Sequence, residues 1–317
     1  MKILVTGAGG FIGSHLCDHL LRKGHDVTGI EGFVGSTPGR LKTRNLKKAE
    51  SHPNFHLEHT NLLEADWNQL LKNKDAVFHL AGIPGVRSSW GDDFKQYIDH
   101  NIWATQKLLE VCRNRPLKKF VYISTSSVYG ETSGKTSETT QPAPLSPYGV
   151  SKLTGEYLCR VYQIAFGVPV VILRYFTVYG PRQRPDMAFH RFIRMILQGE
   201  SIPIYGDGQQ TRDFTYVEDC VAGTAAVLNA DDVIGETINI GGKERASVLD
   251  VMTLLEKITG KKAQLDFQEN PRGEPKHTRA DIAKAEQLLG YKPKISLQDG
   301  LKKEVQDLSE LYGREKL

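Results

Sequence analysis

The sequence predicts an α/β protein with a doubly wound parallel sheet and a smaller second lobe. Short apolar runs alternate with segments of helical periodicity as far as Arg174, and beyond that residue the pattern changes. Strands that alternate with helices form parallel sheets whose two faces are covered by helices. Because such sheets bind ligands beyond the carboxyl ends of their strands, the residues that follow each strand are the first candidates for function.

The first half of the chain supplies the predicted sheet. Each expected strand is a short apolar run, and helical patterns lie between them, notably at 11–21 and 105–112. The basic segment 33–48, which is rich in Gly, Ser and Thr, is expected to be a solvated loop. The strands are expected at residues 3–5, 27–30, 55–57, 76–80, 120–123 and 169–173.

The residues after Arg174 are expected to form the smaller, substrate-binding lobe. Gly180-Pro181 and Arg184-Pro185 mark a long loop at its start. We expect one domain at 1–174 and a second at 175–317, with a segment near 211–234 packing back on the first. Helices of this lobe are expected at 188–197, 248–258, 282–289 and 297–311, and short strands at 202–205 and 237–240.

The composition is that of an ordinary water-soluble protein, with 39% hydrophobic and 25% charged residues among 317. Lys and Arg number 41 against 37 acids, and this excess of four is too small to predict a nucleic-acid partner. No apolar run approaches a membrane span, and the N-terminus runs straight into a strand, so we expect no membrane association and a cytoplasmic location. The cysteines lack metal-binding spacing, which predicts free thiols in a reducing compartment and no metal; they are Cys17, Cys112, Cys159 and Cys220.

A glycine-rich turn follows the first strand. The run Gly7-Ala8-Gly9-Gly10-Phe11-Ile12-Gly13 leads directly into the first predicted helix. Its glycines at 7, 10 and 13 suit a tight turn, a close approach of the backbone to a pyrophosphate, and close packing of helix on strand. The pyrophosphate would lie at the helix N-terminus, where free N–H groups and the helix dipole favour negative charge. The motif therefore predicts a dinucleotide site.

The second predicted strand ends at an acidic residue, Glu31, 18 residues after Gly13. A carboxylate at this position can accept hydrogen bonds from the adenosine ribose and would repel a 2′-phosphate, which favours NAD over NADP. Three basic residues nearby, Arg40, Lys42 and Arg44, keep NADP as the alternative.

The run Tyr148-Gly149-Val150-Ser151-Lys152 predicts a proton-transfer site. Ser146-Pro147 suits the start of a helix, so Tyr148 and Lys152, four residues apart, would share one face of it. A phenol normally titrates near ~10, and we expect the neighbouring ammonium and the positive nicotinamide ring to lower that pKa. Lys152 can also bond the nicotinamide ribose. Thr125, at the end of a strand, would polarise the oxygen that Tyr148 deprotonates.

These residues, together with Asn101, resemble the extended short-chain dehydrogenase/reductase family. More narrowly, the chain resembles the NAD-dependent nucleotide-sugar epimerases and dehydratases over nearly its full length. The resemblance implies a Rossmann domain with tightly held NAD, a nucleotide-sugar lobe and a homodimer joined through a four-helix bundle. It rests also on Arg174-Tyr175-Phe176-Thr177-Val178-Tyr179-Gly180, Gly206-Asp207-Gly208, Arg212-Asp213-Phe214 and Asn239-Ile240-Gly241-Gly242.

The resemblance also implies which residues bind the two ligands. The cofactor-binding residues include the glycine turn, Glu31 and the Tyr–Lys pair. The UDP sugar is expected to be bound largely by hydroxyls and arginines of both lobes. The implied cofactor residues are Gly7, Gly10, Phe11, Ile12, Gly13, Glu31, Asn61, Leu62, Leu80, Ala81, Asn101, Ser124, Tyr148, Lys152 and Tyr175. The implied substrate residues are Arg87, Ser126, Ser127, Thr177, Arg184, Met187, Arg212 and Glu274.

The residues after Thr125 bear on the type of reaction. Members of the group begin by oxidising a sugar hydroxyl to a ketone. In this group the 4,6-dehydratases carry Asp and Glu directly after the threonine, and the decarboxylases usually carry Glu at the second position. Here Ser126 and Ser127 follow, so elimination of water lacks its acid and base. This favours epimerisation, in which the keto sugar turns over and takes the hydride back on its other face.

Thr177 and the run Arg184-Pro185-Asp186-Met187-Ala188 resemble the UDP-glucuronic acid 4-epimerases of that group. We therefore predict epimerisation at C4 of UDP-glucuronic acid to UDP-galacturonic acid. Hydroxyls at Ser126, Ser127 and Thr177 can donate to the uronate carboxylate. Our hypothesis is that they orient it against loss of carbon dioxide from the β-keto acid. A UDP-glucose 4-epimerase, a UDP-glucuronate decarboxylase and a non-catalytic dinucleotide sensor are the alternatives.

Overall fold

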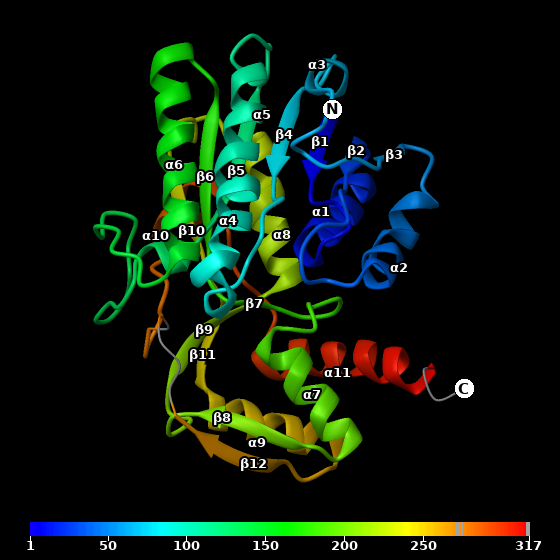
Figure 1. Cartoon of the computed structure of the whole chain (residues 1–317), viewed down its shortest axis with the longest axis vertical. Helices are drawn as coiled ribbons and strands as arrows, with labels where there is room; N and C mark the ends of the chain where they lie inside the picture. Colours follow the sequence, from blue (N-terminus) through cyan, green and yellow to red (C-terminus); the bar gives the residue numbers. More distant parts are fainter. Residues whose placement is uncertain (270–272, 274, 315–317) are drawn as a thin grey trace.

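A seven-stranded sheet forms the larger part of the molecule (Figure 1), in a computed structural model that describes residues 1–269, 273 and 275–314. All its strand pairs are parallel, in the spatial order β3-β2-β1-β4-β5-β6-β10. The chain reverses its direction of travel across the sheet between β1 and β4, where doubly wound sheets bind ligands. The predicted parallel α/β sheet is therefore confirmed. Its strands are β1 (Lys2–Thr6), β2 (Asp26–Ile30), β3 (Phe55–Glu58), β4 (Ala76–His79), β5 (Lys119–Thr125), β6 (Val170–Tyr175) and β10 (Thr237–Ile240).

Helices cover both faces of this sheet, because its strands alternate apolar side chains between two cores. In β1, Ile3 and Val5 belong to the core under α1 and α8, whereas Leu4 belongs to the core under α5 and α6. The helices of this part are α1 (Phe11–Arg22), α2 (Gly39–Glu50), α3 (Trp67–Leu70), α4 (Phe94–Tyr97), α5 (Ala104–Cys112), α6 (Pro147–Phe166), α8 (Val217–Ala226) and α10 (Ala283–Leu289). Short helical turns are η1 (Arg87–Ser89), η2 (Gly91–Asp93), the π-helical η3 (Ile98–Trp103), η4 (Ser126–Val128) and η5 (Val227–Asn229).

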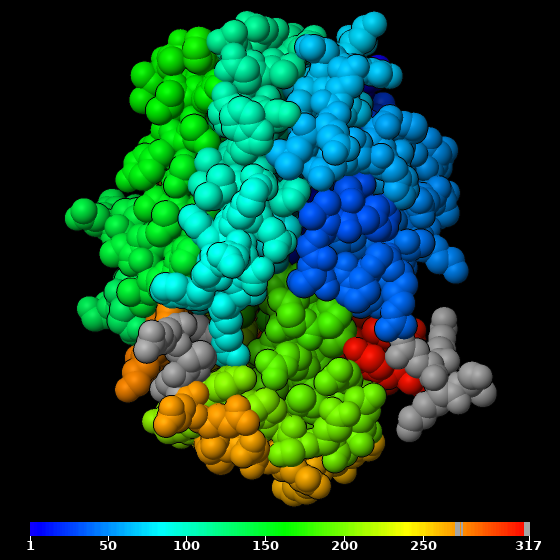
Figure 2. Space-filling model, viewed as in Figure 1, coloured from blue at the N-terminus to red at the C-terminus, as the bar shows by residue number. Residues whose placement is uncertain are grey.

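The smaller lobe lies across the carboxyl ends of the large sheet. In the part of the chain that the structure describes, it contains a three-stranded sheet in the order β11-β9-β7, a parallel pair, β8 and β12, and three helices. In the space-filling view its green and orange surface closes against the cyan and blue surface of the larger part (Figure 2). Its elements are β7 (Val178–Tyr179), α7 (Ala188–Gln198), β8 (Ser201–Tyr205), β9 (Thr211–Tyr216), β11 (Glu244–Ser247), α9 (Val248–Thr259), β12 (Gln264–Gln268) and α11 (Leu297–Arg314).

One strand expected in the smaller lobe belongs to the large sheet. Residues Thr237–Ile240 form β10, which pairs in parallel with β6 and is buried at every position. Burial of the polar Thr237 and Asn239 along with the two isoleucines shows a strand covered on both faces, which the alternating polar and apolar residues did not reveal. The expected domain boundary at residue 174 stays a proposal. One strand of the large sheet, β10, comes from the residues after that boundary.

The segment 33–48, expected to be a solvated loop, is largely helical. Residues Gly39–Glu50 form α2, and Leu41, Leu46 and Ala49 bury one face of it against the larger part. The basic residues hid this pattern because several of them lie on the opposite, solvated face of an amphipathic helix. Only the beginning of the segment is a loop, as the prediction had it.

The cysteines are buried free thiols, as expected: Cys17, Cys112, Cys159 and Cys220. Among residues 1–269, 273 and 275–314, no group of His, Cys, Asp and Glu side chains has the geometry of a metal site. No helix in that same part of the chain is both long and apolar enough to cross a membrane.

The contact between α6 and β5 is unusually close at Gly155. A Cβ atom at this position would overlap the Oη of Tyr122, whose ring is fully buried in the sheet. One turn earlier on the same helix, the Nζ of Lys152 lies 4.3 Å from the centroid of that ring. Glycine at 155 therefore sets how deeply the helix that carries Tyr148 sits on the sheet.

We expect Gly155→Ala to destabilise the protein by about 1–3 kcal/mol, because the extra methyl group cannot be accommodated without moving α6. Urea unfolding measures the change. The control is Gly313→Ala on α11, where a Cβ atom meets nothing within 4 Å and the change should stay below about 1 kcal/mol. Equal stabilities for Gly155→Ala and the wild type would contradict this account of the packing.

Candidate active site

A cavity of about 720 Å³ lies between the carboxyl ends of the large sheet and the smaller lobe. It joins the glycine turn after β1 to the Tyr–Lys pair on α6 and to residues of the smaller lobe. All of the residues expected to bind cofactor or substrate line it, except Asn101 and Glu274. Glu274, with its neighbour Arg272, lies outside the residues that the structure describes.

The glycine turn has the geometry of a pyrophosphate-binding loop. Gly7 has a φ of 71°, which favours glycine, and a Cβ atom at Gly13 would overlap the carbonyl oxygen of Gly7. Gly10 is the N-cap of α1 and offers no side chain to the first N–H groups of the helix. These features leave the backbone open to an anion at the helix N-terminus, so the residues present fit a dinucleotide such as NAD.

The carboxylate of Glu31 is held by donors from three segments. Its Oε1 accepts hydrogen bonds from Phe33 N and Lys42 Nζ, both at 2.8 Å, and its Oε2 accepts one from Gly9 N at 3.0 Å. Glu31 also lines the cavity. A carboxylate oxygen has two lone pairs, so Oε2 keeps one acceptor site for a ribose hydroxyl.

Two of the three basic residues near Glu31, Lys42 and Arg44, have acidic partners. The ammonium of Lys42 is buried against Glu31, and Arg44 pairs with Asp307 of α11 at 2.5 Å. Charges already neutralised in this way offer little to a 2′-phosphate, which weakens the NADP alternative.

The Tyr–Lys pair lies at the start of α6. Ser146 caps this helix, accepting a hydrogen bond from Gly149 N at 3.1 Å, and Pro147 occupies its first turn, as expected. Tyr148 and Lys152 both line the cavity. The hydroxyl of Thr125, the last residue of β5, lines the same cavity and acts to lower the pKa of Tyr148.

The side chains of the chain itself shift the pKa of Tyr148 upward, whereas the expected lowering combined the ammonium of Lys152 with the nicotinamide ring. Burial raises the pKa of Tyr148, while the hydrogen bond from Thr125 and the charge of Arg184 act in the opposite direction. Burial also lowers the pKa of Lys152 to about 8, and Glu156 acts against that change. Removing both groups from water costs more than their spacing on the helix indicated, because desolvation disfavours each charged form.

A buried ion pair lies beneath Lys152. Arg174 donates to both carboxylate oxygens of Glu156, at 2.9 and 2.6 Å, and Ser124 donates to the same carboxylate at 2.5 Å. Bidentate pairing of this kind fixes both side chains. The pair therefore holds the end of β5, where Ser124 reaches the cavity, against α6.

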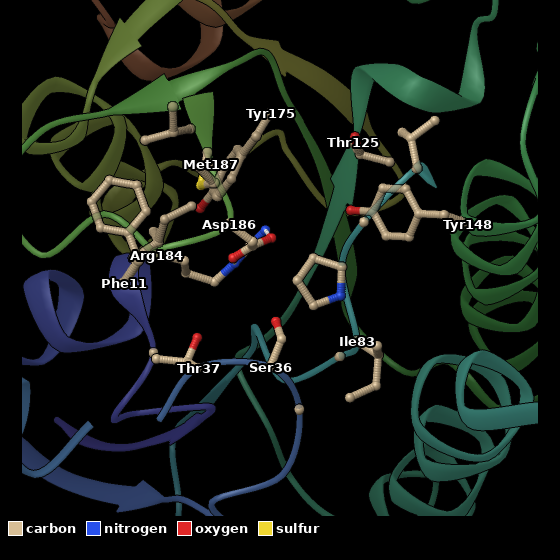
Figure 3. A pocket seen from close by; sticks show the side chains of 18 of the residues that line it. Phe11, Ser36, Thr37, Ile83, Thr125, Tyr148, Tyr175, Arg184, Asp186 and Met187 are labelled. Atoms are coloured by element: carbon tan, nitrogen blue, oxygen red, sulfur yellow. Dashed lines mark hydrogen bonds and ion pairs between the residues drawn. The ribbon is translucent and has the colours of Figure 1, made fainter. Parts of the chain in front are cut away.

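The hydroxyl side chains proposed for the sugar line the same cavity as Tyr148. Ser126 and Ser127 form the short turn η4 directly after β5, and Thr177 lies between β6 and β7. Figure 3 shows Thr125 and Tyr148 on one side of the cavity, with Arg184 and its neighbours Asp186 and Met187 on the opposite side.

The expected substrate arginines come from separate segments. Arg184 pairs in a bidentate way with Asp186, at 3.0 and 2.9 Å. The guanidinium of Arg87 lies 4.2 Å from the ring centroid of Tyr205, which belongs to the smaller lobe. Arg212 donates to the carbonyl oxygen of Lys276 at 3.1 Å. All three arginines line the cavity, as a polyanionic ligand requires.

Asn101 supports the cavity from outside its wall. Its side-chain amide accepts from Ile83 N at 2.7 Å and donates to Ile83 O at 3.0 Å. It also donates to Ser151 Oγ at 2.9 Å, and Ser151 donates to the carbonyl oxygen of Tyr148 at 2.8 Å. Asn101 lies in the π-helical turn η3, so an irregular helix links the loop after β4 to the start of α6.

Several cavity residues were not expected from the sequence. Ser36 and Thr37 lie in the loop between β2 and α2, and Figure 3 shows them along the lower wall of the cavity, with Ser36 between Thr37 and Ile83. The sequence feature that could have identified them is the pair of small hydroxyl side chains shortly after Glu31, the acidic residue that ends the second predicted strand. Tyr205, the last residue of the expected strand 202–205, also lines the cavity, and the neighbouring Gly206-Asp207-Gly208 did not identify it as a site residue.

Comparison with known proteins identifies the class to which this fold and site belong. Residues 3–241 match the NAD dependent epimerase/dehydratase family, and relatives of well over a third identity are matched along almost their whole length. The chain belongs to the NAD dependent epimerase/dehydratase family.

Particular members of the family are very similar to this chain. A UDP-glucuronic acid 4-epimerase of Bacillus cereus, solved in complex with UDP-glucuronic acid and NAD, is 56% identical with a TM-score of 0.97, over 98% of this chain and 100% of that one. An uncharacterised UDP-glucose epimerase of Bacillus subtilis is 60% identical, over 98% of this chain and 99% of its own length. A UDP-glucuronate 4-epimerase of Thermodesulfobacterium geofontis is 39% identical, over 95% and 94%.

We expect Tyr148→Phe to lower kcat by at least about 100-fold while NAD stays bound, because the variant loses only the proton-transferring hydroxyl. Turnover of the nucleotide sugar and the NAD content of the purified protein are the two measurements. Tyr129→Phe is the matched control, since Tyr129 is buried outside the cavity lining and donates to Asn239 at 2.7 Å. Turnover by Tyr148→Phe at the wild-type rate would refute the assignment of Tyr148 as the base.

Proposed function

We propose that this protein catalyses the NAD-dependent epimerisation of UDP-glucuronic acid to UDP-galacturonic acid at C4 of the sugar. The observation that carries the proposal is the set of hydroxyls from Ser126, Ser127 and Thr177 in the cavity that also contains Tyr148. None of the positions directly after Thr125 carries a carboxylic acid that would support elimination. The similarity to the Bacillus cereus enzyme supports the same substrate.

The glycine turn, Glu31 and Lys152 would hold the cofactor. When bound, NAD supplies an acceptor for the hydride that leaves the sugar carbon and a positive charge that favours the phenolate. Tyr148 takes the proton of the C4 hydroxyl, and Thr125 donates a hydrogen bond to the same oxygen. The 4-keto sugar would then turn over within the cavity, and Tyr148 would return the proton to the C4 oxygen once the ketone is reduced on its other face.

The hydroxyls have a second task, which is to protect the keto sugar. A uronate oxidised at C4 is a β-keto acid, and it loses carbon dioxide readily when its carboxylate stands perpendicular to the carbonyl plane. Donors at Ser126, Ser127 and Thr177 come from two adjacent strand ends, β5 and β6, whose pairing fixes their relative position. They would hold the carboxylate away from the perpendicular orientation and so retain the carboxyl group.

The arginines of the cavity would bind the diphosphate. Arg184, Arg212 and Arg87 present planar groups that match phosphate oxygens. Two of them belong to residues 175–317, which we propose as the nucleotide-sugar-binding part, while residues 1–174 supply most of the dinucleotide site. Met187, on the same loop as Arg184, would pack against the sugar.

The purified enzyme should be incubated separately with UDP-glucuronic acid and UDP-glucose, and the products identified by NMR. UDP-galacturonic acid is the expected product, with little conversion of UDP-glucose. Conversion of UDP-glucose alone would show that the substrate is UDP-glucose, which the name of the uncharacterised Bacillus subtilis relative gives. A UDP-pentose as the main product would make the protein a decarboxylase.

We expect Ser127→Glu to lower kcat/KM for UDP-glucuronic acid on the order of 100-fold or more, because a second carboxylate repels that of the substrate within a confined site. Ser127→Ala is the matched control, which removes one donor without adding a charge and should cost only about tenfold. Both variants should retain NAD. Unchanged kinetics in Ser127→Glu would remove this residue from the carboxylate site.

We propose also that two copies of the chain associate through α5 and α6, the arrangement that the family implies. Three apolar side chains at helical spacing along α6 are strongly exposed: Tyr157 at 58%, Val161 at 57% and Ile164 at 86%. Two such helix pairs would bury these side chains in a four-helix bundle. Trp103, just before α5, is exposed at 51% and adds a further apolar side chain to the exposed surface of these helices.

We expect Ile164→Glu to convert a dimer to a monomer, because the charge would be buried in the bundle at a cost of several kcal/mol. Light scattering after gel filtration gives the mass. Phe267→Glu is the control, since Phe267 is similarly exposed, at 56%, but lies on β12 in the smaller lobe. A wild type that elutes as a monomer would end this proposal.

A further inference from the structure

The loop between β7 and α7 contains a backbone conformation that arginine rarely adopts. Arg182 has a φ of 66°, in the left-handed region. Outside glycine, such a conformation costs about 1–2 kcal/mol and persists only where surrounding contacts enforce it. The neighbouring Gly180 also has a positive φ, of 132°, so the chain makes two unusual turns within three residues.

Arg182 is held by acidic residues from both parts of the molecule. Its Nη2 donates to Asp18 Oδ2 of α1 at 2.9 Å, and its backbone N–H donates to Asp307 Oδ2 of α11 at 2.9 Å. The side chains of Arg182 and Asp18 are 18% and 7% exposed. Asp307 also pairs with Arg44 of α2, so one carboxylate joins three segments.

The two residues before Arg182 are anchored in the same way. Gly180 N donates to Glu304 Oε2 of α11 at 2.9 Å, and His15 of α1 donates to Pro181 O at 2.9 Å. Burial lowers the pKa of His15 to about 4, so the imidazole is neutral and donates through Nε2. Gly180, Pro181 and Arg182 are thus each tied to α1, to α11 or to both.

These contacts contribute little to the free energy of folding. Asp18 Oδ1 and Arg182 Nη1 are buried and find no partner in the described part of the chain. A buried ion pair with such leftover groups scarcely repays its desolvation, and the left-handed backbone adds a further cost. An arrangement that is expensive in folding free energy points to a role in holding the loop in place.

The residues that follow Arg182 enter the cavity. Gln183 is fixed by His190, whose backbone N–H donates to Gln183 Oε1 at 2.9 Å. Arg184, Asp186 and Met187 then project into the cavity opposite Tyr148 (Figure 3). The direction in which Arg184 points therefore depends on how the chain leaves Arg182.

We propose that Arg182 is a positioning residue: clamped by Asp18 and Asp307, it joins α1 and α11 and sets the position of Arg184 and Met187 for the nucleotide sugar. The part of this inference that concerns binding of the nucleotide sugar rests on the proposed function. It assigns to Arg182 a part in substrate affinity without contact with the substrate. Asp18, on a helix of the dinucleotide-binding part, thereby acts on the sugar-nucleotide site.

Three variants separate the backbone of Arg182 from its side chain. Arg182→Gly keeps the left-handed φ without strain and loses the ion pair, Arg182→Lys keeps the charge, and Asp18→Asn removes the acidic partner. We expect Arg182→Gly to raise KM for UDP-glucuronic acid about tenfold, equivalent to ~1.4 kcal/mol, with kcat within about twofold. Arg182→Lys should recover part of the loss, and Arg182→Gly with Asp18→Asn should be no worse than Arg182→Gly alone.

Arg194→Ala is the matched control, because Arg194 of α7 pairs with Glu200 at 3.6 Å on the surface. Its KM should equal that of the wild type. The affinity for UDP alone, measured by calorimetry, and amide hydrogen exchange over residues 178–190 report on the clamp whatever sugar the enzyme uses. Both should change in Arg182→Gly, with weaker UDP binding and faster exchange, while the NAD content stays constant.

If the wild type does not epimerise UDP-glucuronic acid, yet Arg182→Gly weakens UDP binding and speeds exchange, the proposed function fails and the clamp stands. Unchanged exchange and UDP affinity in Arg182→Gly would overturn the clamp. A parallel loss of NAD and kcat would also overturn it, because the residue would then serve general stability. An equal effect of Arg194→Ala on KM would do the same.

Discussion

The site depends on how closely α6 packs against β5. Gly155 lets the helix approach the buried ring of Tyr122, and this contact brings Tyr148 and Lys152 to the end of the strand that carries Thr125. The ion pair between Glu156 of α6 and Arg174 of β6 also holds α6 against the sheet. A helix displaced outward by even one methyl group would separate Tyr148 from Thr125, and the proposed chemistry requires both hydroxyls at the same sugar oxygen.

The electrostatics of Tyr148 show that the chain alone does not prepare a phenolate. Burial raises the pKa of Tyr148, and the ammonium of Lys152 lies over the ring of Tyr122. Desolvation thus works against ionisation of the base, while Thr125 and Arg184 favour it. Ionisation in such a site is favoured further by positive charge brought in with the ligands, which links proton removal to an assembled complex.

Much of the fold could be predicted from the sequence because periodic apolar patterns report directly on burial. The parallel sheet, the glycine turn and the cap of α6 depend on residues close together in the chain. The strand Thr237–Ile240 and the helix Gly39–Glu50 were misassigned, since membership of a sheet and the burial of a basic helix are decided by distant partners.

The same limit applies to the site. Tyr148, Lys152 and Thr125 could be recognised by motif, and the structure brings them to one cavity. The pairing of Glu31 with Lys42 and the clamp on Arg182 could not be predicted. Each joins side chains from segments far apart in sequence, and no local pattern encodes the backbone angle of Arg182.

One apolar core has a consequence for how the two lobes behave together. The cluster that contains Ile3 of β1 continues without a break through Ile202 and Val251 to Leu301 of α11. Lobes joined by a shared interior melt as one cooperative unit, unlike domains that meet across a small polar interface. The smaller lobe therefore cannot unfold while the large sheet beside it stays intact, and heat should unfold both lobes in a single transition.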